Sequence, residues 1–192
     1  MKSGDTPGPY HLARARRAGP VIFAAPHAGR RIPPALAELA RVDARALRSL
    51  EDPLVDQLIQ GAGVTTLSAV VARAFVDVNR APEELDPLLV DGGAGRTSRV
   101  QAGLGVIPRL TSVGEPIHRR RLSMQEARTW LAEAHAPYHA ILAELMHETR
   151  ARHGRAVLVD WHSMPSQAAD AEARRSGRRP DIVLGDLHGR AC

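Results

Sequence analysis

Two histidines, His27 and His162, follow apolar runs that lie far apart in the sequence. Residues 21–25 lead through Pro26 to His27, and residues 157–159 lead through an acid and a tryptophan to His162. Short runs rich in β-branched residues that end in Pro-marked turns predict buried strands. If these strands are parallel neighbours, both imidazoles lie at one edge of a sheet, where open α/β sheets bind ligands.

Two histidines and one carboxylate leave an open position on a zinc ion, which polarises a carbonyl and lowers the pKa of water to about 7. The pattern therefore indicates metal-assisted hydrolysis. The carboxylate is Glu51 or Asp52, and Asp160 either orients an imidazole or caps its loop. Each residue also has a structural explanation, because a histidine at a strand end is often a loop residue and Asp52 before Pro53 is a typical helix cap.

Other kinds of site are disfavoured by the sequence. Ser163 lacks the Gly-x-Ser-x-Gly setting that exposes a nucleophile, and no glycine-rich phosphate loop is found. The one cysteine, Cys192, is the last residue, so any metal needs His, Asp or Glu ligands. These features exclude a thiolate cluster within one chain and argue against nucleotide chemistry.

Composition indicates which partners the chain has. The net charge of +5 comes almost wholly from arginine, and aromatic residues make up 3% of the sequence, too few for a base-stacking surface. We therefore expect no nucleic acid partner, whereas a small anionic substrate suits the basic balance. No apolar run approaches the roughly 20 residues that span a bilayer, so we expect no membrane partner and a cytoplasmic location.

The remaining elements predict a single α/β domain over residues 1–192. Residues 1–19 are expected to form an irregular arm, and residues 81–124 long loops. Strands are predicted at the two histidine-bearing runs, at residues 64–67 and at residues 70–80, where apolar side chains alternate. Helices are predicted at residues 34–48, from Asp52 to Gly61 or Gly63, and at residues 124–152 with a kink or break at Pro137. This alternation predicts a three-layer fold, a mostly parallel or mixed sheet with helices on both faces.

Seven blocks of the sequence, in order, resemble the N-formylglutamate amidohydrolase family. They are Pro26-His27-Ala28-Gly29, Asp52-Pro53-Leu54-Val55-Asp56-Gln57-Leu58, Asp77-Val78-Asn79-Arg80-Ala81-Pro82, Gly105-Val106-Ile107-Pro108-Arg109, Pro137-Tyr138-His139, Asp160-Trp161-His162-Ser163-Met164-Pro165-Ser166 and Asp181-Ile182-Val183-Leu184-Gly185-Asp186. The resemblance implies a fold similar to zinc carboxypeptidases and a metal-dependent hydrolase. Its substrate would be N-formyl-L-glutamate or a related N-acyl amino acid, in histidine degradation.

The resemblance also implies a role for individual residues. His27, Asp52 and His162 would bind zinc or another divalent metal, with Asp52 favoured over Glu51. Arg80 would bind a substrate carboxylate, because a guanidinium pairs with it through two parallel hydrogen bonds. Asn79 and Arg109 would be further substrate contacts. Asp160 and Ser163 would support the metal ligands.

The sequence departs from the family pattern after residue 186. Members continue with a strand that bears the glutamate expected to act as general base, whereas the 192-residue sequence does not contain it. The alternative function is therefore a metal-binding or amino-acid-binding relative with weak or no turnover. A shortened sheet would also expose an edge that favours pairing with another chain, which predicts a homo-oligomer.

Overall fold

The computed structural model describes residues 8–186, so the terminal Cys192 lies outside the described residues. The chain divides into two compact units, Met1–His162 and Ser163–Cys192. The expectation that both belong to one domain stays a prediction. The elements of the first unit are β1 (Tyr10–Ala13), β2 (Val21–Ala25), α1 (Pro34–Leu39), α2 (Ala44–Arg48), α3 (Val55–Ile59), β3 (Thr65–Ala69), α4 (Ser98–Gln101), α5 (Met124–Trp130), the π-helix η1 (Leu131–His135), α6 (Ala136–His153) and β4 (Val157–Asp160). The second unit contains α7 (Ser166–Ser176).

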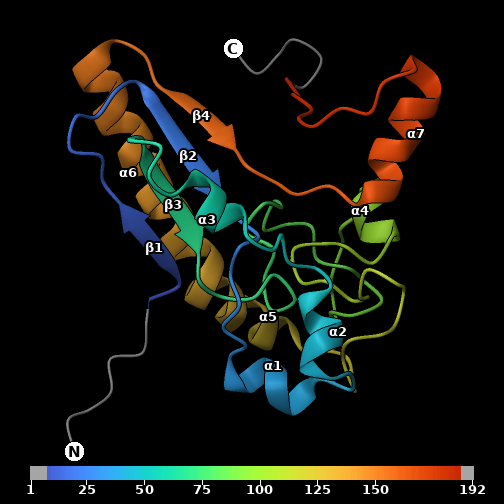
Figure 1. The fold of residues 1–192 in the computed structure, drawn as a ribbon. Helices are drawn as coiled ribbons and strands as arrows, with labels where there is room; N and C mark the ends of the chain where they lie inside the picture. The colour runs from blue at the N-terminus through green and yellow to red at the C-terminus, as the bar shows by residue number, and fades with distance from the viewer. Residues whose placement is uncertain (1–7, 187–192) are drawn as a thin grey trace, which may run out of the picture. The chain divides into compact units, whose positions relative to one another are not determined.

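The first unit is built around a four-stranded mixed sheet in the order β1-β3-β2-β4 (Figure 1). β2 pairs in parallel with both β3 and β4, and β1 pairs antiparallel with β3. The antiparallel strand β1 lies within residues 1–19, so the expectation of an irregular arm is wrong for residues 10–13. Four residues with alternating burial were too short a pattern to distinguish from a loop.

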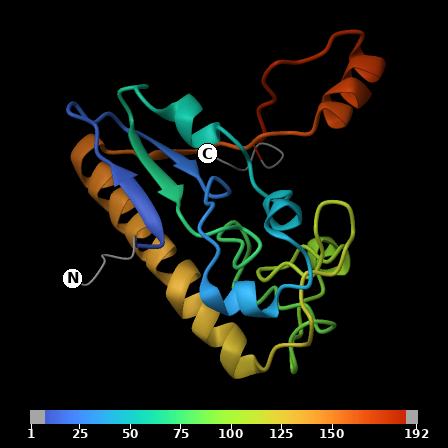
Figure 2. The same ribbon diagram turned by 60° about the horizontal axis from the view of Figure 1, so that its bottom comes forward.

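Helices cover the two faces of this sheet. α6 runs along one face, as the two ribbon views show (Figures 1 and 2). Successive side chains of β2 point to opposite faces. Ile22 belongs to the main core, whereas Phe23 and Ala25 pack with Val55 and Ile59 of α3. The predicted α/β class, with a mixed sheet flanked by helices, is confirmed.

The segment at residues 70–80 is not a strand, which corrects the prediction from its alternating pattern. Its backbone forms turns, and only Val71 makes an isolated bridge, with Arg31. Alternation predicts a strand when one set of side chains faces solvent, but here both sets are buried: Val71, Ala72, Ala74, Phe75, Val76, Asp77 and Val78. The segment passes through the interior and carries Asp77 into it.

The strand β4 is less buried than its apolar sequence indicates. Val157 is 45% exposed and Leu158 is 37% exposed. β4 pairs with β2 on one side, and it is the last strand of the sheet among the described residues. The prediction of a strand is confirmed, but the prediction that it is buried is wrong, because an apolar run does not distinguish a central from an outer strand.

The long helical segment is continuous through Pro137. A capping box between Ser123 and Glu126 begins α5, and the π-helix η1 joins α5 to α6. The Ala136 N–H donates to the Leu131 carbonyl, the i to i−5 bond of a π turn. Pro137 follows the π turn inside this continuous segment, where a proline removes one helical hydrogen bond and crowds the preceding turn, so the predicted disruption takes the form of a π turn.

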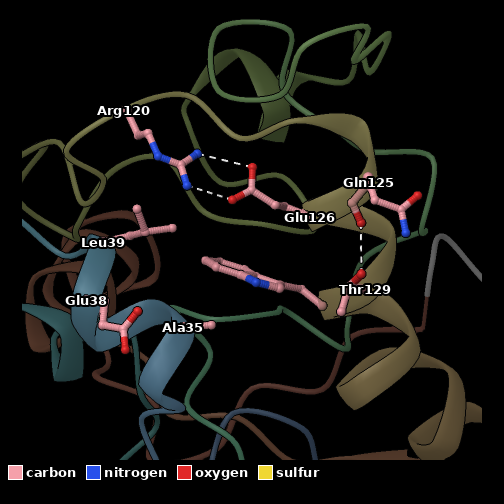
Figure 3. Close-up of a pocket in the computed structure, with 8 residues that line it drawn as sticks. Ala35, Glu38, Leu39, Arg120, Gln125, Glu126 and Thr129 are labelled. Carbon is pink, nitrogen blue, oxygen red and sulfur yellow. Dashed lines mark hydrogen bonds and ion pairs between the residues drawn. The ribbon is translucent and has the colours of Figure 1, made fainter.

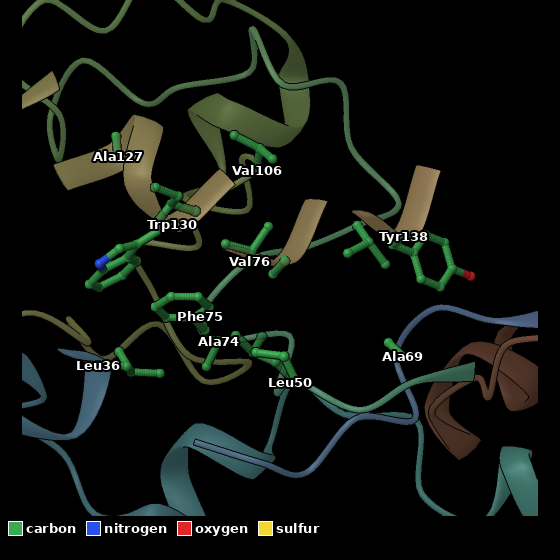
Figure 4. Packing of buried hydrophobic residues seen from close by; sticks show 14 of the residues in the cluster. Leu36, Leu50, Ala69, Ala74, Phe75, Val76, Val106, Ala127, Trp130 and Tyr138 are labelled. Atoms are coloured by element: carbon green, nitrogen blue, oxygen red, sulfur yellow. The ribbon is translucent and has the colours of Figure 1, made fainter. Parts of the chain in front are cut away.

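The main core lies between α6, α5 and the loops that follow β3 (Figure 4). Phe75 stacks on Trp130, with ring centroids 4.4 Å apart. The loops at residues 81–123 contribute apolar side chains that are fully buried, among them Val90, Val106, Ile107, Ile117 and Leu122. The loops are therefore part of the core.

Two smaller differences concern the predicted helices. Residues 34–48 form two short helices, α1 and α2, and Asp43 caps the second. α3 begins at Val55, later than predicted, and its N-cap Leu54 has a left-handed backbone (φ 68°) without a side-chain cap. Among the described residues, no helix is both long and apolar enough to cross a membrane.

Candidate metal centre

His27 and His162 lie at the same edge of the sheet, because β2 and β4 are parallel neighbours. Each histidine follows the last residue of its strand by two positions. Their ring centroids are 4.8 Å apart. His27 is almost fully buried, at 3% exposure, whereas the His162 side chain is 35% exposed. The structure thus brings together the two histidines that the sequence singled out.

Asp52 joins these rings through one carboxylate oxygen. Asp52 Oδ2 lies 3.3 Å from His27 Nδ1 and 2.9 Å from His162 Nδ1. The Asp52 N–H also donates to the His27 carbonyl at 2.9 Å, which ties the two loops together. Asp52 is therefore not the cap of α3, since that position is taken by Leu54.

Together, His27, Asp52 and His162 form a group that could hold a metal ion. One ligand atom from each residue lies within 4.8 Å of the others. Two imidazoles and a carboxylate are a common donor set for zinc, and three protein ligands leave a position open. The donor chemistry therefore fits a divalent metal. Glu51 is not a member of this group in the described structure.

Asp77 holds the other side of His27, and sequence reasoning did not assign it a role in the site. His27 Nε2 lies 2.7 Å from Asp77 Oδ1, and Arg73 Nε donates to Asp77 Oδ2 at 2.9 Å. Burial alone would raise the pKa of Asp77, but the His27 hydrogen bond and the neighbouring positive charges lower it to about 2. The available signal was an acid inside an otherwise apolar segment. A carboxylate on the second nitrogen fixes the tautomer and orientation of a ligating histidine.

His162 has a comparable setting, with carboxylates at both nitrogens. Asp160 Oδ2 lies 3.6 Å from His162 Nε2, on the side opposite Asp52. The neighbouring carboxylates of Asp160 and Asp52 raise the pKa of His162 to about 9. Asn79 Nδ2 also lies 3.1 Å from His162 Nε2. An amide N–H donates only to an unprotonated Nε2, so in the imidazolium form the Asn79 oxygen takes this place.

Asn79 and Arg80 follow Asp77 in a turn, and the Arg80 N–H donates to the Asp77 carbonyl. Arg80 Nη1 donates to the Asn79 carbonyl at 2.8 Å, and Arg80 Nε lies 3.9 Å from Asp77 Oδ2. The Arg80 Nε is buried without a hydrogen-bond partner in the described structure. Its Nε therefore lies near the Asp77 carboxylate without a hydrogen bond to it.

The structure gives Arg109 a structural partner. Its Nε donates to Asp86 Oδ2 at 2.7 Å, and Asp86 is buried, at 2% exposure. Arg109 as a substrate contact stays a prediction. Ser163 begins the second unit, so its predicted support of the metal ligands also stays a prediction.

A separate pocket of about 270 Å³ lies between α1 and α5 (Figure 3). The paired Arg120 and Glu126 side chains stand on one side of it, and Glu38 and Leu39 of α1 stand on the other. None of the metal-centre residues lines this pocket. It is therefore distinct from the candidate site.

The comparisons with known proteins agree on one family. The family model described as N-formylglutamate amidohydrolase matches residues 19–192. The chain is 32% identical over 177 residues to an N-formylglutamate deformylase of Pseudomonas aeruginosa, and 29% identical to that of Pseudomonas putida. Each alignment covers 90% of this chain and 61% of the relative, so the chain spans about 61% of their length.

One solved structure shows the same relationship, and a second shares the fold. An N-formylglutamate amidohydrolase from Ralstonia eutropha superposes with a TM-score of 0.81 at 28% identity, covering 96% of this chain and 69% of that one. A protein of Agrobacterium tumefaciens superposes with a TM-score of 0.63 at 22% identity, covering 82% of this chain and 57% of that one. The second match supports the fold alone.

Proposed function

Because the chain belongs to the N-formylglutamate amidohydrolase family, we propose that it hydrolyses N-formyl-L-glutamate or a closely related N-acyl amino acid with the help of a divalent metal. The observation that carries this proposal is the convergence of two histidine Nδ1 atoms on one oxygen of Asp52. The place in histidine degradation and the cytoplasmic location implied by the sequence belong to the same proposal.

His27, Asp52 and His162 would hold the metal, which we take to be zinc. When bound there, it supplies Lewis acidity toward the amide carbonyl and lowers the pKa of water. Asp77 keeps the Nε2 proton of His27 in place, so that the Nδ1 lone pair of His27 faces the site. Asp160 lies where it can do the same for His162.

The substrate carries carboxylates, and the turn after Asp77 carries the positive charge of Arg80, which could bind one of them. Arg80 would bind one carboxylate through guanidinium N–H groups, and Asn79 would donate an amide hydrogen bond. Arg109 would be a further contact for a substrate carboxylate. In the reaction, the oxygen of water bonds to the formyl carbon, the C–N bond breaks, and the amino nitrogen takes a proton. Formate and glutamate are released.

A second candidate function, binding without turnover, is favoured by the state of the carboxylates around the site. A general base must be free to accept a proton from water. Among the described residues, Asp52 lies between the two histidines, Asp77 accepts from His27, Arg73 and the Asn79 N–H, and Asp160 lies beside His162. Asp52 would be taken up as a metal ligand, Asp77 is taken up by its donors, and Asp160 lies against His162.

One experiment separates these functions. Zinc content and formate release from N-formyl-L-glutamate are measured for the full chain, for His162→Ala, and for His11→Ala as a control on an exposed histidine of β1. We expect His162→Ala to lose zinc and to lower kcat/KM by more than about 100-fold. Loss of a metal ligand should exceed the roughly 10–100-fold effect of losing a residue that only hydrogen-bonds to a ligand. Unchanged turnover in His162→Ala would refute the proposal. Zinc and ligand binding without formate release would establish the second candidate.

A further inference from the structure

Two histidines of the long helical segment contact the backbone of the turn that follows Asp77. His139 Nε2 lies 2.8 Å from the Val78 carbonyl oxygen, and His135 Nε2 lies 2.8 Å from the Arg80 carbonyl oxygen. A carbonyl only accepts, so both Nε2 atoms carry the proton and donate. The two rings lie against each other, with centroids 4.3 Å apart.

The helix geometry explains why both rings reach the same turn. His135 and His139 are four residues apart, a spacing that places side chains on one helix face. His135 is the last residue of the π-helix η1, and π turns occur frequently at functional sites. Burial lowers the pKa of His135, which favours the neutral ring with a single N–H. That N–H is the one directed at the Arg80 carbonyl.

The residue between the two contacted carbonyls is Asn79. The carbonyls of Val78 and Arg80 are both fixed by histidines, and the Asn79 carbonyl accepts from Arg80 Nη1. The Asn79 side chain lies against His162 Nε2, at 3.1 Å. The two helix histidines therefore fix the backbone on both sides of a residue that touches the metal centre, and the backbone of the arginine proposed to bind substrate.

We propose that His135 and His139 are positioning residues for substrate binding, acting through Asn79 and Arg80. This inference rests on the proposed function, because it explains how the carboxylate-binding arm of that site is held. The geometry of two short hydrogen bonds flanking Asn79 carries it. The simpler explanation is that the histidines only fasten the helix to a loop. In that case their loss would lower stability without changing ligand affinity.

Substitution of each histidine by glutamine and by asparagine tests the inference, because the two amide side chains have the same polarity and different lengths. Glutamine keeps an amide N–H near the position of histidine Nε2, whereas the shorter asparagine does not reach the carbonyl. We compare His139→Asn with His139→Gln and His135→Asn with His135→Gln, and use His147→Asn, at an exposed position of α6, as the control. Thermal unfolding identifies the folded variants, and if one asparagine variant does not fold, the other carries the test.

Two measurements are made on the full chain with zinc added. Hydrogen exchange reports the amides of Asn79 and Arg80, which bond to the Asp77 side chain and carbonyl. Calorimetry reports the Kd for N-formyl-L-glutamate. We expect the asparagine variants to speed exchange at these two amides by about tenfold or more, and to raise the Kd by at least about tenfold. The glutamine variants and His147→Asn should stay close to the wild type.

The outcomes separate the two proposals. Faster exchange with an unchanged Kd would overturn the positioning role and leave a structural one. Unchanged exchange in the asparagine variants would show that the histidine hydrogen bonds do not hold the turn at all. If the wild type does not bind N-formyl-L-glutamate, the proposed function fails. Faster exchange confined to the asparagine variants would then still establish that the histidines hold this turn.

Discussion

Asp77 is a fully buried carboxylate, with 0% exposure, and protein groups of positive charge or donor character surround it. It accepts hydrogen bonds from Arg73 and from the Asn79 N–H, and it contacts His27 Nε2. Arg73 Nη1 also donates to the Leu50 carbonyl, close to Asp52. The buried acid therefore connects the two loops that carry the candidate metal ligands.

We expect Asp77→Asn to weaken zinc binding by about 10–100-fold, because the amide no longer supplies a carboxylate to orient His27. The measurement is the zinc Kd by competition with a chelator. Asp91→Asn, at an exposed acid paired with Arg121, is the control. An unchanged zinc Kd in a folded Asp77→Asn protein would contradict the role of Asp77.

Arg109 gives a prediction about stability. Arg109→Met leaves Asp86 buried without its charge partner, which we expect to lower the free energy of unfolding by about 3 kcal/mol. Arg14→Met, which removes an exposed partner of Glu148, should change the free energy of unfolding far less, because exposed ion pairs contribute little. Urea unfolding measures both. A small effect of Arg109→Met on stability with a large effect on the Kd for N-formyl-L-glutamate would instead favour a substrate contact.

The sequence could narrow the metal ligands to a short set, but it could not choose among them. Asp52 before a proline matches a helix cap as well as it matches a ligand. The choice depends on the left-handed Leu54, which begins α3 later and leaves the Asp52 side chain directed at the histidines. Asp77 was missed because a pattern of alternating side chains does not reveal which acid is buried.

Among the elements, the start of α5 offers a test by pH. Hydrogen bonds from Arg120 and from Ser123 lower the pKa of Glu126 from 4.5 to about 2. A lowered pKa stabilises the folded state above the usual pKa, and this contribution disappears as pH falls toward the folded value. Glutamine can keep the capping-box bond but loses the charge that pairs with Arg120 and with the helix N-terminus, so we expect Glu126→Gln to cost about 0.5 kcal/mol at pH 7.

The difference in unfolding free energy between wild type and Glu126→Gln should shrink as pH falls from 4.5 to about 2. Urea unfolding at a series of pH values measures it. Glu133→Gln, at an exposed position of η1, is the control. A difference that stays constant over this range would contradict the assignment of the effect to the ionised carboxylate.

Elements whose sequence pattern reflects local structure were predicted well. The strands β2, β3 and β4 and the long helical segment were all expected near their observed positions. The segment at residues 70–80 was not, because its conformation is decided by tertiary contacts: its amides bond to the carbonyls of Pro9, Arg31 and Val106. No periodicity within the segment encodes such partners.

At the scale of the whole molecule, the exposed strand β4 predicts self-association. Among the described residues it is the last strand of the sheet, and its Val157 and Leu158 side chains are exposed, which favours pairing with another chain. We expect Leu158→Lys to reduce concentration-dependent association, because a charged residue opposes such pairing. Sedimentation velocity at several concentrations measures this. Val113→Lys, at a residue that is 78% exposed in a loop, is the control. A wild-type protein that is monomeric at all concentrations would contradict the prediction.

The α/β architecture could be predicted from the alternation of strands and helices. The contribution of the loops to the core could not. The loops at residues 81–123 supply buried side chains such as Val90, Ile117 and Leu122. The spacing of these buried residues follows neither the 3.6-residue period of a helix nor the 2-residue period of a strand, because they lie in irregular loops. The sequence therefore indicated the sheet and its edge, and not the loops that fill the space beside it.

The π-helix η1 has a consequence for how one helical segment can serve two neighbours. A π turn holds one residue more than an α turn, and each residue rotates the helix by about 100°. Trp130 before the turn stacks on Phe75 in the core, whereas His135 and His139 after it contact the turn beside the metal centre. The extra residue rotates the side chains after the π turn about the helix axis relative to those before it, so that each set faces its own contact surface. A regular α-helix of the same direction could keep one of them in register, but not both.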